Sequence, residues 1–319
     1  MKFGKRNAAT GGDGHGSLVS GAVLALVVIW LFICLLVGWY WSSEPDLEPV
    51  AGAPQPEMVN GEYTARTLRA VVQTLLEKPG GYLSNDIMPP GLWLDNMPRW
   101  EYGVLVQVRD MTRALRRDMA RSQSQSTEDR DLAKAEPRLH FDNNSWAMPA
   151  SESEYRDGIR SLDSYIERLQ RGEADFYSRA DNLSSWVGDV STRLGSMSQR
   201  LSASVGRAPL TTGGKLGETT PWLEIDDVFY EARGTSWALV QRLRAVEHDF
   251  ADVLEKKNAL VSLQQIIREL EATQQTLWSP MVLNGDGFGM LANHSLVMAN
   301  YLSRANAGMI ELRRLLEQG

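Results

Sequence analysis

Residues that build metal sites and disulfides are scarce in this sequence. Its 319 residues include one cysteine, Cys34, and four histidines. One cysteine cannot form an intramolecular disulfide, and scattered histidines without further cysteines leave no ligand set for a zinc or iron–sulfur site. We therefore expect no metal and no other cofactor.

Positive charge is also in short supply. Lys and Arg number 33 against 40 Asp and Glu, which gives a formal net charge of −7. Proteins that bind nucleic acid carry a basic surface that neutralises phosphates, and this chain has neither an overall basic excess nor a basic tail. Nucleic acid is therefore not expected as a partner.

Catalytic signatures and strand patterns are missing as well. His140, His248 and His294 stand alone without an HExxH motif, and there is no GxSxG serine. The glycine-rich run 284–289 lacks the carboxylates of a calcium loop and the Gly-Lys-Ser/Thr of a phosphate loop, so it is typical of a tight turn. No segment shows a convincing strand alternation. The sequence thus favours an all-α protein and weighs against an enzyme.

One long apolar run stands near the N-terminus. Residues 18–41 carry no charged side chain, and as a helix they would extend about 36 Å, enough to cross a hydrocarbon core of about 30 Å. Aromatic residues close the run at Trp39, Tyr40 and Trp41, as at a membrane interface. We predict a transmembrane helix that contacts the lipid bilayer through residues 18–41. A cleaved signal peptide is the alternative, because residues 51–53 resemble a cleavage site, but the run exceeds an ordinary signal-peptide core.

The charges that flank this run predict its orientation. Lys2, Lys5 and Arg6 precede it, whereas no Lys or Arg occurs between Trp41 and Arg66. Positive flanking charge stays on the cytoplasmic side. Residues 1–17 are therefore expected to be a cytoplasmic tail, and everything after residue 41 is expected outside. An exported part without cysteine fits the periplasm behind a bacterial inner membrane.

The exported part is predicted to consist of a spacer and one all-α domain. Residues 42–61 are rich in proline and have too little apolar surface to fold against anything, so we interpret them as the spacer. Residues 62–319 form the periplasmic domain. Its long helices are expected over about 151–203, 222–278 and 289–317.

The apolar residues of the two longest predicted helices recur at intervals of four and three. The first series runs from Tyr155 to Leu201 and has one polar member, Glu173, next to Gly172. Such a 3.5-residue repeat is typical of coiled coils, and the glycine is the expected place of any kink. The sequence therefore predicts an antiparallel bundle of long coiled-coil-like helices, in which the first two bury each other's apolar seams.

The loop from Gly80 to Glu101 holds the most unusual combination of side chains. Carboxylates beside tryptophans are used in sugar binding and glycoside hydrolysis, so the loop is a candidate binding surface. The same residues also serve as helix caps, turn formers and packing residues, which is the interpretation we favour. The candidate residues are Asp86, Trp93, Asp95, Arg99, Trp100 and Glu101.

A stripe of arginines follows on the next predicted helix. It could meet anionic lipid headgroups or an acidic partner. Asp110 and Asp118 lie among the arginines, and a solvated face with local ion pairs is the interpretation we favour. The stripe consists of Arg109, Arg113, Arg116, Arg117 and Arg121.

Four stretches carry a resemblance to a known family. They read PGGYLSNDIMPP, LDNMPRWEYG, RSQSQSTEDRDL and FYSRADNL. They resemble a family of single-pass inner-membrane proteins of Gram-negative bacteria that is defined only by a domain of unknown function. The resemblance implies a place in the bacterial envelope and carries no activity.

Two functional hypotheses remain. The favoured one is a non-enzymatic, membrane-anchored periplasmic scaffold or interaction protein with an envelope protein as partner, and homo-oligomer formation stays open. The alternative is a periplasmic enzyme that acts on cell-wall or lipid-linked glycan through Asp86, Asp95 and Glu101. Convergence of these three carboxylates in an open cleft would favour the enzyme.

Overall fold

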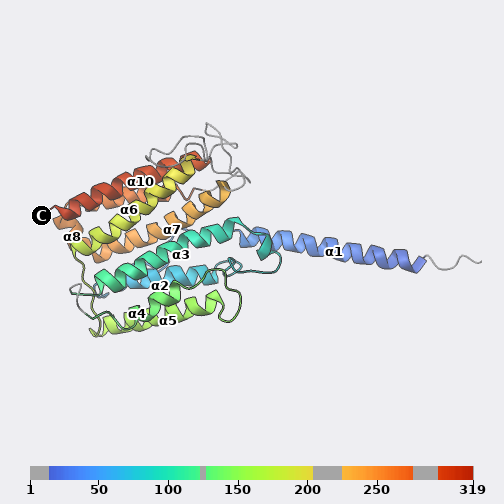
Figure 1. The fold of residues 1–319 in the computed structure, drawn as a ribbon, viewed down its shortest axis with the longest axis horizontal. Coiled ribbons are helices and arrows are strands. Elements are labelled where there is room, and N and C mark those ends of the chain that lie inside the picture. Colours follow the sequence, from blue (N-terminus) through green and yellow to red (C-terminus); the bar gives the residue numbers. More distant parts are fainter. Residues whose placement is uncertain (1–13, 123–126, 204–224, 276–293, 319) are drawn as a thin grey trace, which may run out of the picture.

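The computed structural model describes residues 14–122, 127–203, 225–275 and 294–318. Within these residues every regular element is helical and there is no strand, which confirms the predicted all-α class. The first described element is a long helix, α1 (Gly14–Trp41), that projects from one end of a helical bundle. The C-terminal end of the chain lies at the opposite end of the bundle (Figure 1).

Helix α1 has the character that the sequence predicted. Residues Ser20–Trp41 are long and apolar enough to cross a membrane, and no other helix among the described residues meets that condition. Most of its large apolar side chains are exposed, for example Leu24, Leu26 and Leu35. A membrane anchor and a signal sequence are both consistent with such a helix.

The bundle consists of two groups of helices joined through α7. In each group the buried side chains recur at three- and four-residue intervals, as in α2, where Leu68, Val71, Val72 and Leu75 are fully buried. The first group contains α2 (Glu62–Glu77), α3 (Asn96–Ala114), α4 (Leu132–Leu139) and α5 (Ser151–Gln170). The second contains α6 (Ala180–Ala203), α7 (Ile225–Asp249), α8 (Ala251–Lys256), α9 (Leu260–Ala272) and α10 (His294–Glu317). Helix α7 packs on α2 and α3 (Figure 1).

The long helices that the sequence predicted are interrupted. The helix expected over 151–203 is two helices, α5 and α6, because Gly172 adopts a left-handed conformation (φ 70°) and the amide of Glu173 bonds back to the carbonyl of Arg168. The helix expected over 222–278 is divided into α7, α8 and α9, with Asn258 at φ 52° in the second break. The outer parts of two expected helices, 222–224, 276–278 and 289–293, and the turn at 284–289 lie outside the described residues.

The helices also pair differently from the prediction. Helix α6 packs mainly on α10 rather than on α7. The two run antiparallel, since Ser184 bonds to Glu317 near one end and Ser198 bonds to the carbonyl of Ala299 near the other. The seam residues of α6 are buried as expected, with Leu183 and Leu194 fully covered. The periodicity therefore identified the buried face correctly but assigned it the wrong partner.

Helices α3 and α7 form a close parallel pair. A methyl group on Gly103 would lie 2.2 Å from the carbonyl oxygen of Glu231, and one on Gly234 would lie 2.0 Å from that of Trp100. Because glycine has no side chain, the backbones of α3 and α7 can approach to a distance at which any Cβ atom would overlap a carbonyl oxygen. The pair fixes the start of α3, and with it the loop before α3, against α7.

Candidate functional site

The segment between α1 and α2 is bound to the domain. Glu44 accepts hydrogen bonds from the guanidinium of Arg233 at 2.7–3.0 Å. The carbonyl of Asp46 accepts the indole N–H of Trp237 at 2.9 Å, and the carbonyl of Glu48 accepts the side chain of Gln241 at 3.0 Å. The expected spacer is therefore held along α7. Polar side chains of α7 bind its backbone carbonyls, and Leu47, Val50 and Val59 pack against the apolar core, so the expectation that this segment folds against nothing is wrong.

Arg233 is the centre of this attachment. Its side chain is 6% exposed and its donors reach Glu44 and the carbonyls of Thr273 and Gln275. A buried guanidinium without its carboxylate would be strongly unfavourable. The segment after α1 and helix α7 are thus coupled by one buried charge.

The loop between α2 and α3 lies directly against α1. A methyl group on Gly38 would lie 3.5 Å from Pro90, and one on Gly80 would lie 2.7 Å from the ring of Trp41. Further along α1, the ring of Trp30 meets the ring of Trp93 edge to face, with centroids 5.9 Å apart. The loop and the spacer together connect α1 to the domain on two sides.

Glu101, one of the candidate site residues, forms the base of this loop. Its carboxylate lies 2.6 Å from the ammonium of Lys78, and both side chains are fully buried. It also accepts the backbone N–H groups of Leu83 at 2.9 Å and Ser84 at 2.8 Å. Burial raises the pKa of Glu101, although Lys78 and the hydrogen bonds oppose this rise. This carboxylate contacts Lys78, Leu83 and Ser84, so it ties the loop to α3.

The other two carboxylates occupy different surroundings. Asp95 is the N-cap of α3 and accepts the backbone N–H of Asn96 at 2.9 Å. Asp86 is half-buried and packs on Gly91, where an added methyl group would lie 1.9 Å from its carboxylate oxygen. Burial and the nearby charge of Glu152 raise the pKa of Asp86. No contact joins Asp86, Asp95 and Glu101 into one cluster in the part of the chain that the structure describes.

The remaining candidate residues of the loop divide into packed and exposed ones. Trp100 is fully buried and packs on Trp237 with ring centroids 5.2 Å apart. Arg99 forms an ion pair with Asp227 at 2.7 Å. Trp93 is half exposed beside α1. The two tryptophans therefore lie in different surroundings, one buried against α7 and the other half exposed beside α1.

The predicted arginine stripe faces α4 and the segments on either side of it. Arg109 donates to the carbonyls of Leu139 and Phe141 at 3.1 and 2.7 Å. Glu136 forms ion pairs with Arg113 and Arg116. Glu128 forms ion pairs with Arg116 and Arg121. Arg117 is exposed. The stripe begins about 20 Å along α3 from its start beside α1. It is therefore close to α1 in sequence but distant from it in space, and its charges are largely used in local ion pairs.

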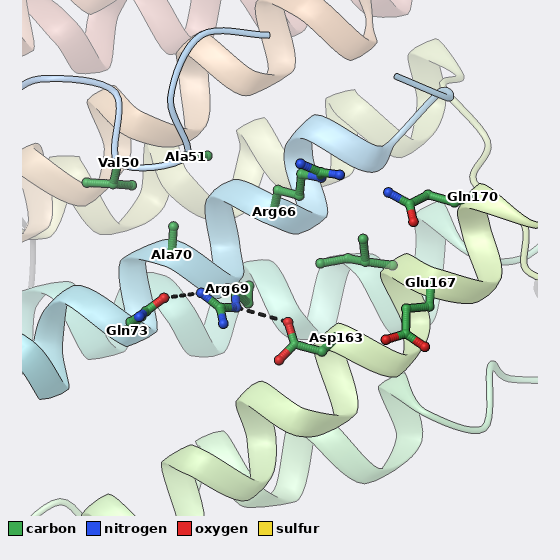
Figure 2. A pocket seen from close by; sticks show the side chains of 10 residues that line it. Val50, Ala51, Arg66, Arg69, Ala70, Gln73, Asp163, Glu167 and Gln170 are labelled. Atoms are coloured by element: carbon green, nitrogen blue, oxygen red, sulfur yellow. Dashed lines mark hydrogen bonds and ion pairs between the residues drawn. The ribbon is translucent and has the colours of Figure 1, made fainter. Parts of the chain in front are cut away.

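A groove that the sequence analysis missed lies between α2 and α5. It has a volume of about 550 Å³, and Val50 and Ala51 of the spacer line one side of it. Figure 2 shows Arg69 between Gln73 of its own helix and Asp163 of α5, to which it donates at 2.9 Å. The sequence did contain a signal for this groove. Two arginines at helical spacing occur in one helix, Arg66 and Arg69, and two carboxylates at helical spacing occur in the other, Asp163 and Glu167.

The groove has a mixed polar character. Two arginines, two carboxylates and two amides line it, and the guanidinium of Arg66 already pairs with Glu62 at 2.6 Å. Within the described residues no group of three or more His, Cys, Asp or Glu side chains could hold a metal ion. The arrangement suits contact with a polar protein segment better than binding of one strongly charged small molecule.

Comparison with protein families gives one match. The family model described as "Uncharacterized protein conserved in bacteria (DUF2333)" matches residues 15–319. This match confirms the resemblance to a bacterial family of unknown function. No curated protein and no solved structure matches the chain.

Proposed function

The chain belongs to this uncharacterised bacterial family, DUF2333, and on that premise we propose that it is a membrane-anchored helical scaffold or interaction protein of the cell envelope. In this proposal residues 18–41 cross the inner membrane once. Residues 1–17 lie in the cytoplasm and residues 42–319 lie in the periplasm. The protein has no catalytic activity of its own.

The observation that carries the proposal is the double attachment of the domain to α1. The spacer is bound to α7 and the loop before α3 is bound to α1 itself. A flexible tether would allow the domain to rotate freely on the membrane, whereas these contacts hold it in one orientation. A fixed orientation suits a protein whose surfaces must meet other envelope components.

The same contacts support retention of α1. Cleavage near residues 51–53 would release the segment that holds Glu44 against Arg233. Breaking a buried ion pair by removal of one partner typically costs about 3–5 kcal/mol. The mature domain would therefore be less stable than the full chain, which is not expected of a signal peptide.

The charge pattern supports the proposed orientation. Lys2, Lys5 and Arg6 precede α1, and no basic residue follows it before Arg66. The carboxylate contacts support a non-enzymatic role, since Glu101 is held by Lys78 and two backbone amides.

Tags at both termini test the anchor. We expect a single full-length band in the inner-membrane fraction that carries both tags, and a reporter enzyme active only in the periplasm should work when fused after Gly319. A shorter band without the N-terminal tag would show a cleaved signal peptide. Activity of a cytoplasm-specific reporter at Gly319 would reverse the topology. Either result would overturn the proposal.

We place the contact with an envelope protein in the groove between α2 and α5. A photo-crosslinking amino acid in place of Glu167, an exposed lining residue, should give a defined cross-linked product in living cells. The matched control is the same replacement of Arg314, an exposed residue of α10. A product with the mass of two chains would identify a homo-oligomer, whereas equal labelling at both positions would refute a specific contact in the groove.

A further inference from the structure

Exposed apolar side chains gather in two loops of the domain. Outside α1, the large apolar side chains that are exposed in the described part of the chain number eight, and six of them come from residues 87–93 and 146–148. The other two are Val261 and Ile310. The six are Ile87, Met88, Leu92, Trp93, Trp146 and Met148.

The two loops lie side by side. The side chain of Asn85 donates to the carbonyl of Ser145 at 2.8 Å and to Glu152 at 2.7 Å. The hydroxyl of Tyr82 donates to the carbonyl of Asn143 at 3.0 Å. Both loops therefore lie at one end of the domain, the end from which α1 projects (Figure 1).

The first loop extends along α1 for about two turns. Pro90 lies near Gly38, and Trp93 meets Trp30. Trp30 precedes Trp41 by 11 positions, which corresponds to about 16 Å along the helix axis. If residues 18–41 cross a bilayer, Trp30 lies near the middle of the hydrocarbon layer, because the half-thickness of that layer is about 15 Å. The ring of Trp93, which contacts Trp30, then lies within the hydrocarbon layer.

The composition of the first loop matches such a location. Residues 87–94 read IMPPGLWL and contain no charged side chain, while Asp86 and Asp95 stand at the two ends. A carboxylate is costly in hydrocarbon but not at its border with water. The aspartates thus mark the points at which the loop would enter and leave the apolar layer.

Part of the backbone of the loop is also suited to lipid. A segment inside a bilayer must satisfy its polar backbone groups internally. Pro89 and Pro90 have no N–H group, and the amides of Leu92, Trp93 and Leu94 bond to carbonyls within the loop at 2.9–3.0 Å. The 3-10 helix η1 (Gly91–Trp93) forms part of this arrangement.

We propose that residues 87–94 dip into the periplasmic leaflet of the bilayer beside α1, and that Trp146 and Met148 contact the same leaflet. The occupant of this apolar surface is lipid, because the loop continues the lipid-exposed surface of α1. A second insertion point prevents the domain from rotating or tilting about the single anchor. The inference rests on the proposed membrane-spanning role of α1.

Fluorescence quenching in the full chain tests the location. Cys34 is replaced by Ser, and single cysteines at Met88, Val261 or Leu26 are labelled with an environment-sensitive probe. Met88 and Val261 are equally exposed at 71%, so they form a matched pair, and Leu26, exposed at 66%, reports on α1. The protein is reconstituted in vesicles of phosphatidylethanolamine and phosphatidylglycerol.

Nitroxide-labelled lipid should quench the probes at positions 26 and 88 several-fold more than the probe at 261, and aqueous iodide should show the reverse order. Lipid quenching at 26 but not at 88, with iodide quenching at 88, would refute the dipping loop and leave the anchor intact. Protection at 88 from both quenchers would indicate a protein contact and also refute the proposal. Failure of lipid quenching at position 26 would refute the anchor itself.

Discussion

The ion pair between Lys78 and Glu101 leads to the sharpest test of how the loop before α3 is built. Both side chains are fully buried at a distance of 2.6 Å. Replacement of Glu101 by Gln leaves the ammonium of Lys78 buried without its counter-charge. Loss of one partner of a buried pair typically costs about 3–5 kcal/mol. We therefore expect Glu101→Gln to lower the free energy of unfolding by about that amount, even though the amide oxygen still accepts one backbone N–H.

A double variant separates the charge from the shape. Lys78→Met with Glu101→Gln leaves no uncompensated charge, so it should be less destabilised than Glu101→Gln alone. The matched control is Asp95→Asn, the same chemical change in the same loop. Asp95 is a helix N-cap, and Asn caps as well as Asp, so its stability should change little.

Chemical denaturation followed by far-UV circular dichroism in detergent gives the free energies. The denaturant slope must stay constant among the variants for the comparison to hold. The amount of each variant in cells is measured beside complementation of a deletion phenotype. If Glu101→Gln kept normal stability and normal abundance but lost function, the ion pair would not be structural and Glu101 would act on a substrate.

Three further predictions concern other contacts. Replacement of Gly103 or Gly234 by Ala should destabilise the protein by about 1–3 kcal/mol, because each methyl group would meet a backbone carbonyl. The control is Gly195→Ala, whose methyl group would meet only the side chain of Asn306 at 3.2 Å, and it should be near neutral in thermal unfolding. Leu183→Ala and Leu194→Ala should each cost about 2–5 kcal/mol, and Ser185→Ala, at an exposed position of the same helix, should stay within about 0.5 kcal/mol; equal effects would contradict the observed register. Burial tends to raise the pKa of Asp131, but hydrogen bonds from Ser164 and Arg168 hold it below its ordinary value, so this group stabilises the fold above about pH 4 and the stabilisation is lost as pH falls through the lowered pKa. The difference in unfolding free energy between wild type and Asp131→Asn should accordingly shrink on acidification, and a difference that grew would contradict the pairing.

Apolar periodicity predicted buried faces well but could not identify their partners. The series from Tyr155 to Leu201 is buried almost throughout, yet its two halves pack on different helices. A heptad pattern reports which side of a helix is covered and contains no information on which element covers it. The break at Gly172 falls beside Glu173, the one polar residue of the series, where continuous packing would bury a charge.

The attachment of the spacer could not be predicted for a related reason. It combines backbone carbonyls that meet Trp237 and Gln241 with single apolar side chains such as Leu47 and Val50, and neither kind of contact forms a periodic apolar pattern. In contrast, the burial of Glu101 had a signal in the sequence. Glu101 is four residues before Leu105 and seven before Val108, both fully buried, so it lies on the apolar face of its helix. Its partner Lys78 lies in the preceding loop and could not be deduced from spacing.

The buried ion pairs occur where irregular segments join helices. Glu44 binds Arg233 where the spacer meets α7, Lys78 binds Glu101 where the loop meets α3, and Arg168 binds Asp129 and Asp131 at the start of α4. Buried pairs add little net stability compared with apolar residues of the same size, but they are directional and leave few alternative arrangements. At the first two joints they determine how the helical domain is set on α1. In the proposed membrane-anchored role, these charges would fix the orientation of the domain relative to α1, so that the same face of the domain is always presented.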